Sequence, residues 1–161
     1  MNTSEVASMM AQIIPAVESI LKEGGPSHAR QAALSEQEKM DCHALARRHY
    51  DDCRYQEALQ LFMLLLMEDM CNSKLHLAVG ACLKMMNKST EAIAIYSLAW
   101  FFDPDNVKTL FYLGQCLLAD GKREDGRDML QEFVDRAAND SQYAVLAKRA
   151  QGLLMTTAGA A

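Results

Sequence analysis

The fold of this chain is decided by residues 73–106, which read SKLHLAVGACLKMMNKSTEAIAIYSLAWFFDPDN. Two apolar stretches with helical periodicity flank a turn at Asn87, a residue type that tolerates positive φ. Gly80 and Ala92 stand one in each stretch, where missing side-chain bulk allows two antiparallel helices to approach closely. Pro104 stands where the second helix must stop. The segment therefore predicts a pair of packed helices.

The same pattern occurs before and after this segment at one constant interval. The small residues are Ala46, Gly80 and Gly114 in the first helices and Ala58, Ala92 and Gly126 in the second helices. The large apolar residues are Leu45, Val79 and Leu113, with Phe62, Tyr96 and Leu130. A repeat period of about 34 residues, which is the interval of these sets, is typical of tetratricopeptide repeats (TPRs). We predict a repeat region over 36–139, with three repeats at about 39–72, 73–106 and 107–140. Gly121 supplies a turn in the third repeat as Asn87 does in the second, whereas Cys53 departs from that rule in the first.

Both ends of the chain carry a further helical pattern, so the predicted fold is all-α throughout. Residues 1–25 predict an N-terminal amphipathic helix, and residues 141–155 a C-terminal capping helix with Ser141 as its candidate N-cap and disorder from about Thr156. The N-terminal stripe either packs on the first repeat or pairs with another subunit. In the second case its interface residues are Met9, Met10, Ile13, Ile14, Val17, Ile20 and Leu21.

Composition excludes several classes of function. A formal net charge of −5 argues against nucleic-acid binding, which depends on clustered Lys and Arg. Five cysteines, an odd count without framework spacing, favour reduced thiols in the cytoplasm. No apolar run approaches the roughly 18 residues of a membrane span, and we expect no secretory leader and no stable membrane association.

In a stacked array of helix pairs the first helices line the concave side, where ligands bind. The helical period predicts a groove of mixed apolar and basic character that suits an extended peptide. Its predicted residues are Met40, His43, Arg47, Tyr50, Lys74, Leu77, Ala81, Met85, Lys108, Phe111 and Leu118, with Lys84 and Gln115 on the same faces. The competing interpretation is that some of these side chains serve the core between helices.

The sequence predicts neither an enzyme nor a cofactor or metal site. Cys42 adjoins His43, but neighbours on a helix point about 100° apart, so this pair cannot act as a nucleophile and its base. Cysteine and histidine spacings typical of zinc sites are missing from the sequence, as is a phosphate-binding loop.

Several segments resemble the class II (translocator) chaperones of bacterial type III secretion systems, the SycD/LcrH/IpgC/PcrH-like family. They are ILKEGG at 20–25, YQEA at 55–58, GAC at 80–82 and GQCLL at 114–118. The likeness runs from about Ile20 to Leu154. It implies a bacterial cytoplasmic chaperone, commonly a homodimer, that holds an extended segment of hydrophobic translocator proteins in the groove and keeps them soluble before export.

Two alternatives to this function stay open. One is a TPR co-chaperone of a needle or filament subunit, and the other is a regulatory or scaffold TPR protein without an exported client.

Overall fold

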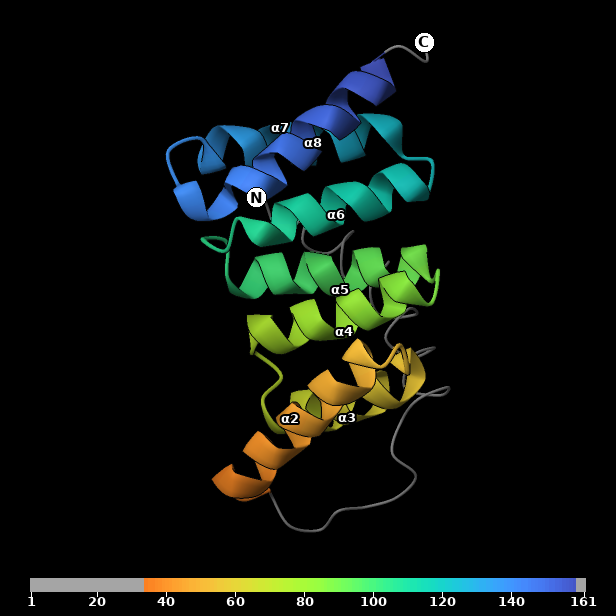
Figure 1. The fold of residues 1–161 in the computed structure, drawn as a ribbon, viewed down its shortest axis with the longest axis vertical. Coiled ribbons are helices and arrows are strands. Elements are labelled where there is room, and N and C mark those ends of the chain that lie inside the picture. The colour runs from red at the N-terminus through yellow and green to blue at the C-terminus, as the bar shows by residue number, and fades with distance from the viewer. Residues whose placement is uncertain (1–33, 159–161) are drawn as a thin grey trace, which may run out of the picture.

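The computed structural model describes residues 34–158, and within them every regular element is a helix. Figure 1 shows these helices stacked in chain order along the long axis of the molecule. They are α2 (Glu36–Asp51), α3 (Tyr55–Glu68), α4 (Ser73–Met85), α5 (Ser89–Phe102), α6 (Lys108–Ala119), α7 (Arg123–Ala137), the short 3-10 helix η1 (Ser141–Tyr143) and α8 (Ala144–Ala158). The predicted all-α, TPR-type array is confirmed, and residues 1–25, with the whole predicted N-terminal helix, lie outside the described residues.

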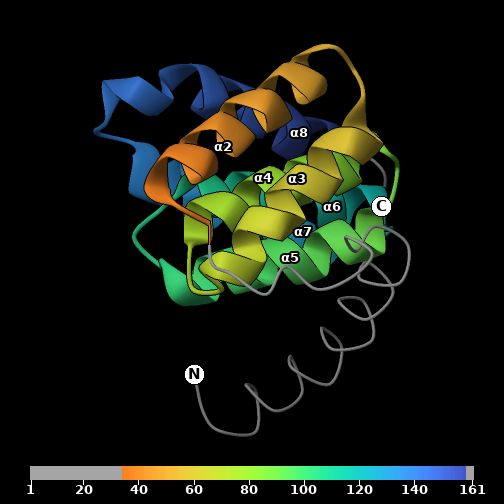
Figure 2. The ribbon, with the colours of Figure 1, turned by 90° about the horizontal axis from the view of Figure 1, so that it is seen from below.

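Each helix packs chiefly on its neighbours in the sequence, from α2 on α3 to α7 on α8. This is the contact pattern of a repeat solenoid, in which each unit buries its apolar face against the next. The helix pairs are α2 with α3, α4 with α5, and α6 with α7. In the view along the stack, α2 and α5 lie on opposite sides of the molecule (Figure 2).

The three intra-pair turns have one backbone geometry. Cys53, Asn87 and Gly121 all have positive φ, at 60°, 61° and 81°. The residue after each turn donates its N–H to a carbonyl five residues earlier, as Arg54 does to His49 at 2.8 Å. Cys53 therefore departs from the rule in residue type but not in conformation. The helix pairing imposes a left-handed turn that costs a residue with a Cβ more than it costs glycine.

Close helix contact at the predicted small residues is also present. A Cβ on Gly80 would lie 2.7 Å from the Tyr96 ring, so the aromatic side chain of α5 occupies the space that glycine leaves on α4. In the third pair the two backbones themselves approach. A Cβ on either Gly114 or Gly126 would lie 3.0 Å from the other residue's carbonyl oxygen.

The core divides into two clusters that meet at α6. The larger cluster joins α2 to α6 and includes Phe62, Leu83 and Tyr96. The smaller joins α6, α7 and α8 around Phe111 and Phe133. Residues of α8 therefore pack over the last helix pair, α6 and α7.

Two expectations about that helix were wrong in detail. Asp140, not Ser141, supplies the capping side chain, because its carboxylate accepts the N–H of Gln142 at 3.0 Å. The helix also runs through Thr156 to Ala158, where the hydroxyl of Thr157 and the carbonyl of Leu154 approach the guanidinium of Arg127 on α7. None of the helices within residues 34–158 has the length and hydropathy that a bilayer crossing requires.

Candidate functional site

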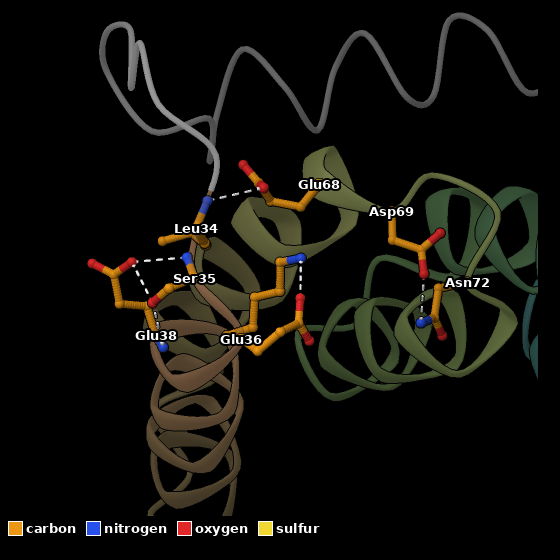
Figure 3. Close-up of polar contacts among 8 residues, drawn as sticks. Leu34, Ser35, Glu36, Glu38, Glu68, Asp69 and Asn72 are labelled. Atoms are coloured by element: carbon orange, nitrogen blue, oxygen red, sulfur yellow. Dashed lines mark hydrogen bonds and ion pairs between the residues drawn. The ribbon is translucent and has the colours of Figure 1, made fainter.

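An open pocket of about 440 Å³ lies where α2 begins, α3 ends and α4 begins, and we call it the entrance pocket. Its polar rim includes Glu36, Glu68 and Asp69 (Figure 3). The rim is fixed by local contacts, since Lys39 pairs with Glu36 at 2.7 Å and the backbone N–H of Leu34 donates to Glu68 at 3.1 Å. The remaining lining residues are Lys39, Met40, His43, Leu65, Asn72, Lys74 and Leu75.

The start of α2, which frames this pocket, is held by a capping box. The Ser35 hydroxyl accepts the N–H of Glu38 at 3.3 Å, and the Glu38 carboxylate accepts the backbone N–H of Ser35 at 2.9 Å (Figure 3). Such reciprocal bonds satisfy the free N–H groups of a first turn. The first turn of α2 is therefore preorganised beside the pocket.

A second open pocket of about 220 Å³ lies further along α2 and α4, and we call it the tyrosine pocket. Arg47 and Tyr50 come from α2, Ala78 and Ala81 from α4, and Phe62 from α3; Asp51 completes the lining. The two pockets are neighbours, because the ring of His43, in the entrance pocket, meets the ring of Phe62 edge to face at 5.7 Å. Together they form an apolar trough with charged edges.

Tyr50 contributes a phenol to the lining of the tyrosine pocket. Its ring meets that of Tyr55 edge to face at 5.3 Å, which orients it. Burial raises the pKa of the Tyr50 phenol, with smaller contributions from nearby thiols and phenols. The group is therefore neutral at physiological pH and presents a hydroxyl that can donate to a peptide carbonyl.

Beyond the tyrosine pocket lies a polar group that we call the Lys84 cluster: Lys84 on α4, Tyr112 and Gln115 on α6, and Arg149 on α8. The Lys84 ammonium donates to the Gln115 side-chain carbonyl and lies 5.7 Å from the centroid of the Tyr112 ring. Tyr112 is in turn stacked on Tyr96, with the ring planes 17° apart. Burial lowers the pKa of Lys84; the nearby Cys116 thiol acts in the opposite direction, and the charge of Arg149 lowers the pKa further.

The structure brings six of the predicted groove residues to the two pockets. Met40, His43 and Lys74 line the entrance pocket, and Arg47, Tyr50 and Ala81 line the tyrosine pocket. Met85 is exposed near the end of α4, and Leu77 is half-buried against the larger core cluster. Lys108 is exposed, and its Nζ lies 5.7 Å from the centroid of the Tyr143 ring, so it contacts η1 from the start of α6.

Two predicted groove residues belong to the core instead. Phe111 is fully buried, with its ring 5.4 Å from that of Phe133, because residues of α8 cover this face of α6. Leu118 is half-buried and fills the space beside Gly126, where an added Cβ would lie 2.9 Å from it. A charge at position 111 would therefore test folding rather than binding.

Four residues of the tyrosine pocket and the Lys84 cluster were not among the predicted groove residues: Phe62, Ala78, Tyr112 and Arg149. A signal for Arg149 was present, since it follows Gln115 by one full repeat period, just as Gln115 follows Ala81. The repeat period thus continues into the capping helix. Phe62 comes from a second helix, and its place in a pocket wall depends on tertiary packing.

Two of the cysteines are buried in the core. Burial raises the pKa of Cys82 to about 12 and that of Cys116 to about 11, so both are neutral thiols near pH 7. Within residues 34–158 no group of three metal-binding side chains converges. The predicted dimer stripe, from Met9 to Leu21, lies outside this range and has no structural description.

The fold and the trough define a class of protein: a TPR-type helical-repeat protein with an open trough along its first helices. Within that class, the resemblance to class II translocator chaperones is confirmed by comparison with known proteins. The chain is 29% identical, over 142 residues, to the Low calcium response locus protein H of Yersinia pestis, covering 86% of this chain and 82% of that one. No protein-family profile matches the chain.

Solved structures agree with this comparison. The Yersinia enterocolitica type III secretion chaperone SycD, crystallised with a peptide of the translocator YopD, is 25% identical, with a TM-score of 0.74 over 77% of this chain and 95% of that chain. PcrH from Pseudomonas aeruginosa has the same fold at 24% identity, with a TM-score of 0.75 over 81% of this chain and 99% of that chain. PcrH has also been solved in complex with the chaperone binding region of PopD.

Proposed function

We propose that this protein is a type III secretion chaperone that binds an extended segment of a hydrophobic translocator protein and keeps it soluble before export. The main support for the proposal is that two features of the chain agree. The sequence is similar along most of its length to Low calcium response locus protein H, and the fold is that of chaperones crystallised with translocator peptides. We assign the client segment to the trough along α2 and α4, because both of its pockets are open and line the first helices.

The chemistry of the trough suits such a client. Apolar walls from Met40, Phe62 and Leu65 can bury aliphatic side chains, at roughly 25 cal/mol per Å² removed from water before ordering costs. Arg47 and Lys74 at the edges attract and orient a peptide. Holding requires no ATP, since binding lowers the free concentration of the client by mass action. The proposed role is therefore not enzymatic, and its place is the bacterial cytoplasm, where the client is made.

We further propose a homodimer formed through the apolar stripe of residues 1–25. SycD, a relative in fold, has been crystallised in an alternative dimer form. Leu34, the first described residue, is buried, and its backbone N–H donates to Glu68 at the end of α3, which fixes the start of the described chain on the first repeat. A partner's first repeat and N-terminal segment would lie together there.

The test of the proposed function is coexpression with the translocators of the same secretion system. We expect the wild-type chaperone to keep a translocator in the soluble fraction and to copurify with it. Ala81→Arg, which places a long cation in the tyrosine pocket, should abolish copurification while the helical circular dichroism stays unchanged. Gln60→Arg is the matched control, because Gln60 is exposed on α3 and lines neither pocket.

Two results would count against the proposal. If the translocators are equally soluble with and without the chaperone, the protein does not have the proposed function. Copurification that survives Ala81→Arg would place the client elsewhere on the surface.

A further inference from the structure

The Lys84 cluster holds positive charge without a partner of opposite sign among the described residues. Between residues 34 and 158, no carboxylate lies within ion-pairing distance of Lys84 or Arg149. Lys84 is half-buried between α4 and α6, and the Arg149 guanidinium carbon lies 5.7 Å from the centroid of the Phe111 ring. That ring is 5.4 Å from the ring of Tyr112, over which Lys84 lies.

This arrangement is electrostatically unfavourable in the unliganded protein. A partly buried cation loses hydration, and a second cation nearby adds repulsion. Both effects act on Lys84: burial is the main cause of its lowered pKa, and the charge of Arg149 adds to this against the opposing effect of the Cys116 thiol. The Tyr112 ring offers a favourable but weaker cation–π contact. An anion placed between the two cations would offset the repulsion and accept hydrogen bonds from both.

The cluster is continuous with the trough. Ala81, in the wall of the tyrosine pocket, precedes Lys84 by one turn of α4, so both point to the same side of the helix. Arg47, Ala81, Gln115 and Arg149 occupy equivalent positions, each one repeat period after the last. An extended peptide that fills the tyrosine pocket and continues along the stack would therefore meet Lys84 and Gln115 next.

We infer that the Lys84 cluster is an acidic-residue subsite, which binds the side-chain carboxylate of an Asp or Glu within the extended client segment. The inference rests on the proposed function and specifies the chemistry of the client. The carboxylate accepts hydrogen bonds from the Lys84 ammonium, the Gln115 amide N–H and the Arg149 guanidinium. Gln115 already accepts one bond from Lys84, which fixes the ammonium in the subsite. The chaperone thus selects a client segment that has an acidic residue next to the apolar side chains that fill the tyrosine pocket.

The experiment uses short peptides, acetylated and amidated at their ends, that together cover the translocator which copurifies with the full-length chaperone. The tightest-binding peptide is remade with each Asp changed to Asn and each Glu to Gln. We expect one of these changes to weaken binding to the wild-type chaperone by about tenfold or more, as the loss of a charge-assisted hydrogen bond predicts. Lys84→Met should weaken the acidic peptide similarly and its amide analogue by less than about twofold.

Two variants control the interpretation. Lys148→Met removes a charge from the exposed neighbour of Arg149 and should preserve the preference for the acidic peptide. Gln115→Glu places a carboxylate in the cluster beside Lys84, so it should reverse the preference in favour of the amide analogue. This second variant keeps the side-chain size and tests the subsite even if Lys84→Met disturbs folding.

The possible results separate the subsite from the function. If no peptide binds the wild-type chaperone, the proposed function fails and the subsite with it. If peptides bind but the tightest one contains no acidic residue, or binds equally well as its amide analogue, only the subsite is overturned. Equal weakening of both peptides by Lys84→Met would likewise overturn it. Blocked termini ensure that any carboxylate detected is a side chain, so binding that requires a free C-terminus would also contradict the inference.

Discussion

Gly114→Ala tests the reason for the close approach of α6 and α7. In an isolated helix this change stabilises, because alanine is favoured over glycine by about 1 kcal/mol in a helix interior. In the folded protein the new Cβ would lie 2.8 Å from Cγ of Leu130 and 3.0 Å from the carbonyl oxygen of Gly126. Both distances are shorter than van der Waals contact, so the two helices must separate or Leu130 must move.

The expected magnitude follows from these opposing effects. Overpacking a close-packed core costs typically about 1–3 kcal/mol. The upper part of that range applies here, because the Gly126 carbonyl belongs to the helix backbone and cannot rotate away, and Leu130 is fully buried. Subtracting the helix-propensity gain of about 1 kcal/mol leaves a net loss of about 1–2 kcal/mol in the free energy of unfolding.

Urea unfolding followed by circular dichroism measures this loss. Gly152→Ala is the matched control, because Gly152 also lies in a helix but has nothing within 4 Å of its added Cβ. We expect Gly152→Ala to raise the free energy of unfolding by up to about 1 kcal/mol. A Gly114→Ala protein that is as stable as the wild type, or stabilised like the Gly152 variant, would refute the close-contact explanation.

Three further predictions concern the turn, a buried histidine and the N-terminal segment. Cys53→Gly should raise the free energy of unfolding by about 0.5–1 kcal/mol, because Cys53 has φ 60° and glycine tolerates that conformation, although it also gains entropy when unfolded; an equal or lower urea midpoint would contradict this. Burial lowers the pKa of His76 from 6.5, so below that pH the unfolded chain takes up the proton more readily and stability falls. His76→Asn should reduce the loss of stability between pH 7.5 and pH 5.5, and an unchanged pH dependence would show that other groups control it. Removal of residues 1–22 should shift the protein toward monomer in sedimentation, whereas an unchanged dimer mass would exclude the N-terminal stripe as the interface.

The fold was predictable because the geometry of a repeat depends on the type of residue at a few local positions. Small residues that recur in each repeat, such as Gly80 on the first helix and Ala92 on the second helix of the middle repeat, permit close helix packing, and the constant repeat period places these contacts at equal intervals. The same period placed six predicted residues of α2 and α4 where they line the two pockets, since a helix fixes which side chains share a face. Arg149 also lies one repeat period after Gln115. The sequence did not show that Arg149 belongs to the Lys84 cluster, because this depends on how α8 packs beside α6.

The remaining features depend on packing between elements that the sequence pattern treats as equivalent. His43 and Phe111 hold the same position in different repeats, but His43 lines an open pocket while α8 buries Phe111. Cys53 adopts a left-handed turn because the helix pair around it requires one, against its own conformational preference.

The amino-acid sequence by itself determined the helices, their pairing and the likeness to translocator chaperones, because these follow from periodicity and residue size along the chain. Only the tertiary structure decided which side chains of a shared face stay open to a ligand, and that Lys84 and Arg149 lie over the adjacent rings of Tyr112 and Phe111. Burial and electrostatic repulsion depend on distances between segments that are far apart in the sequence, and those distances exist only in the folded protein.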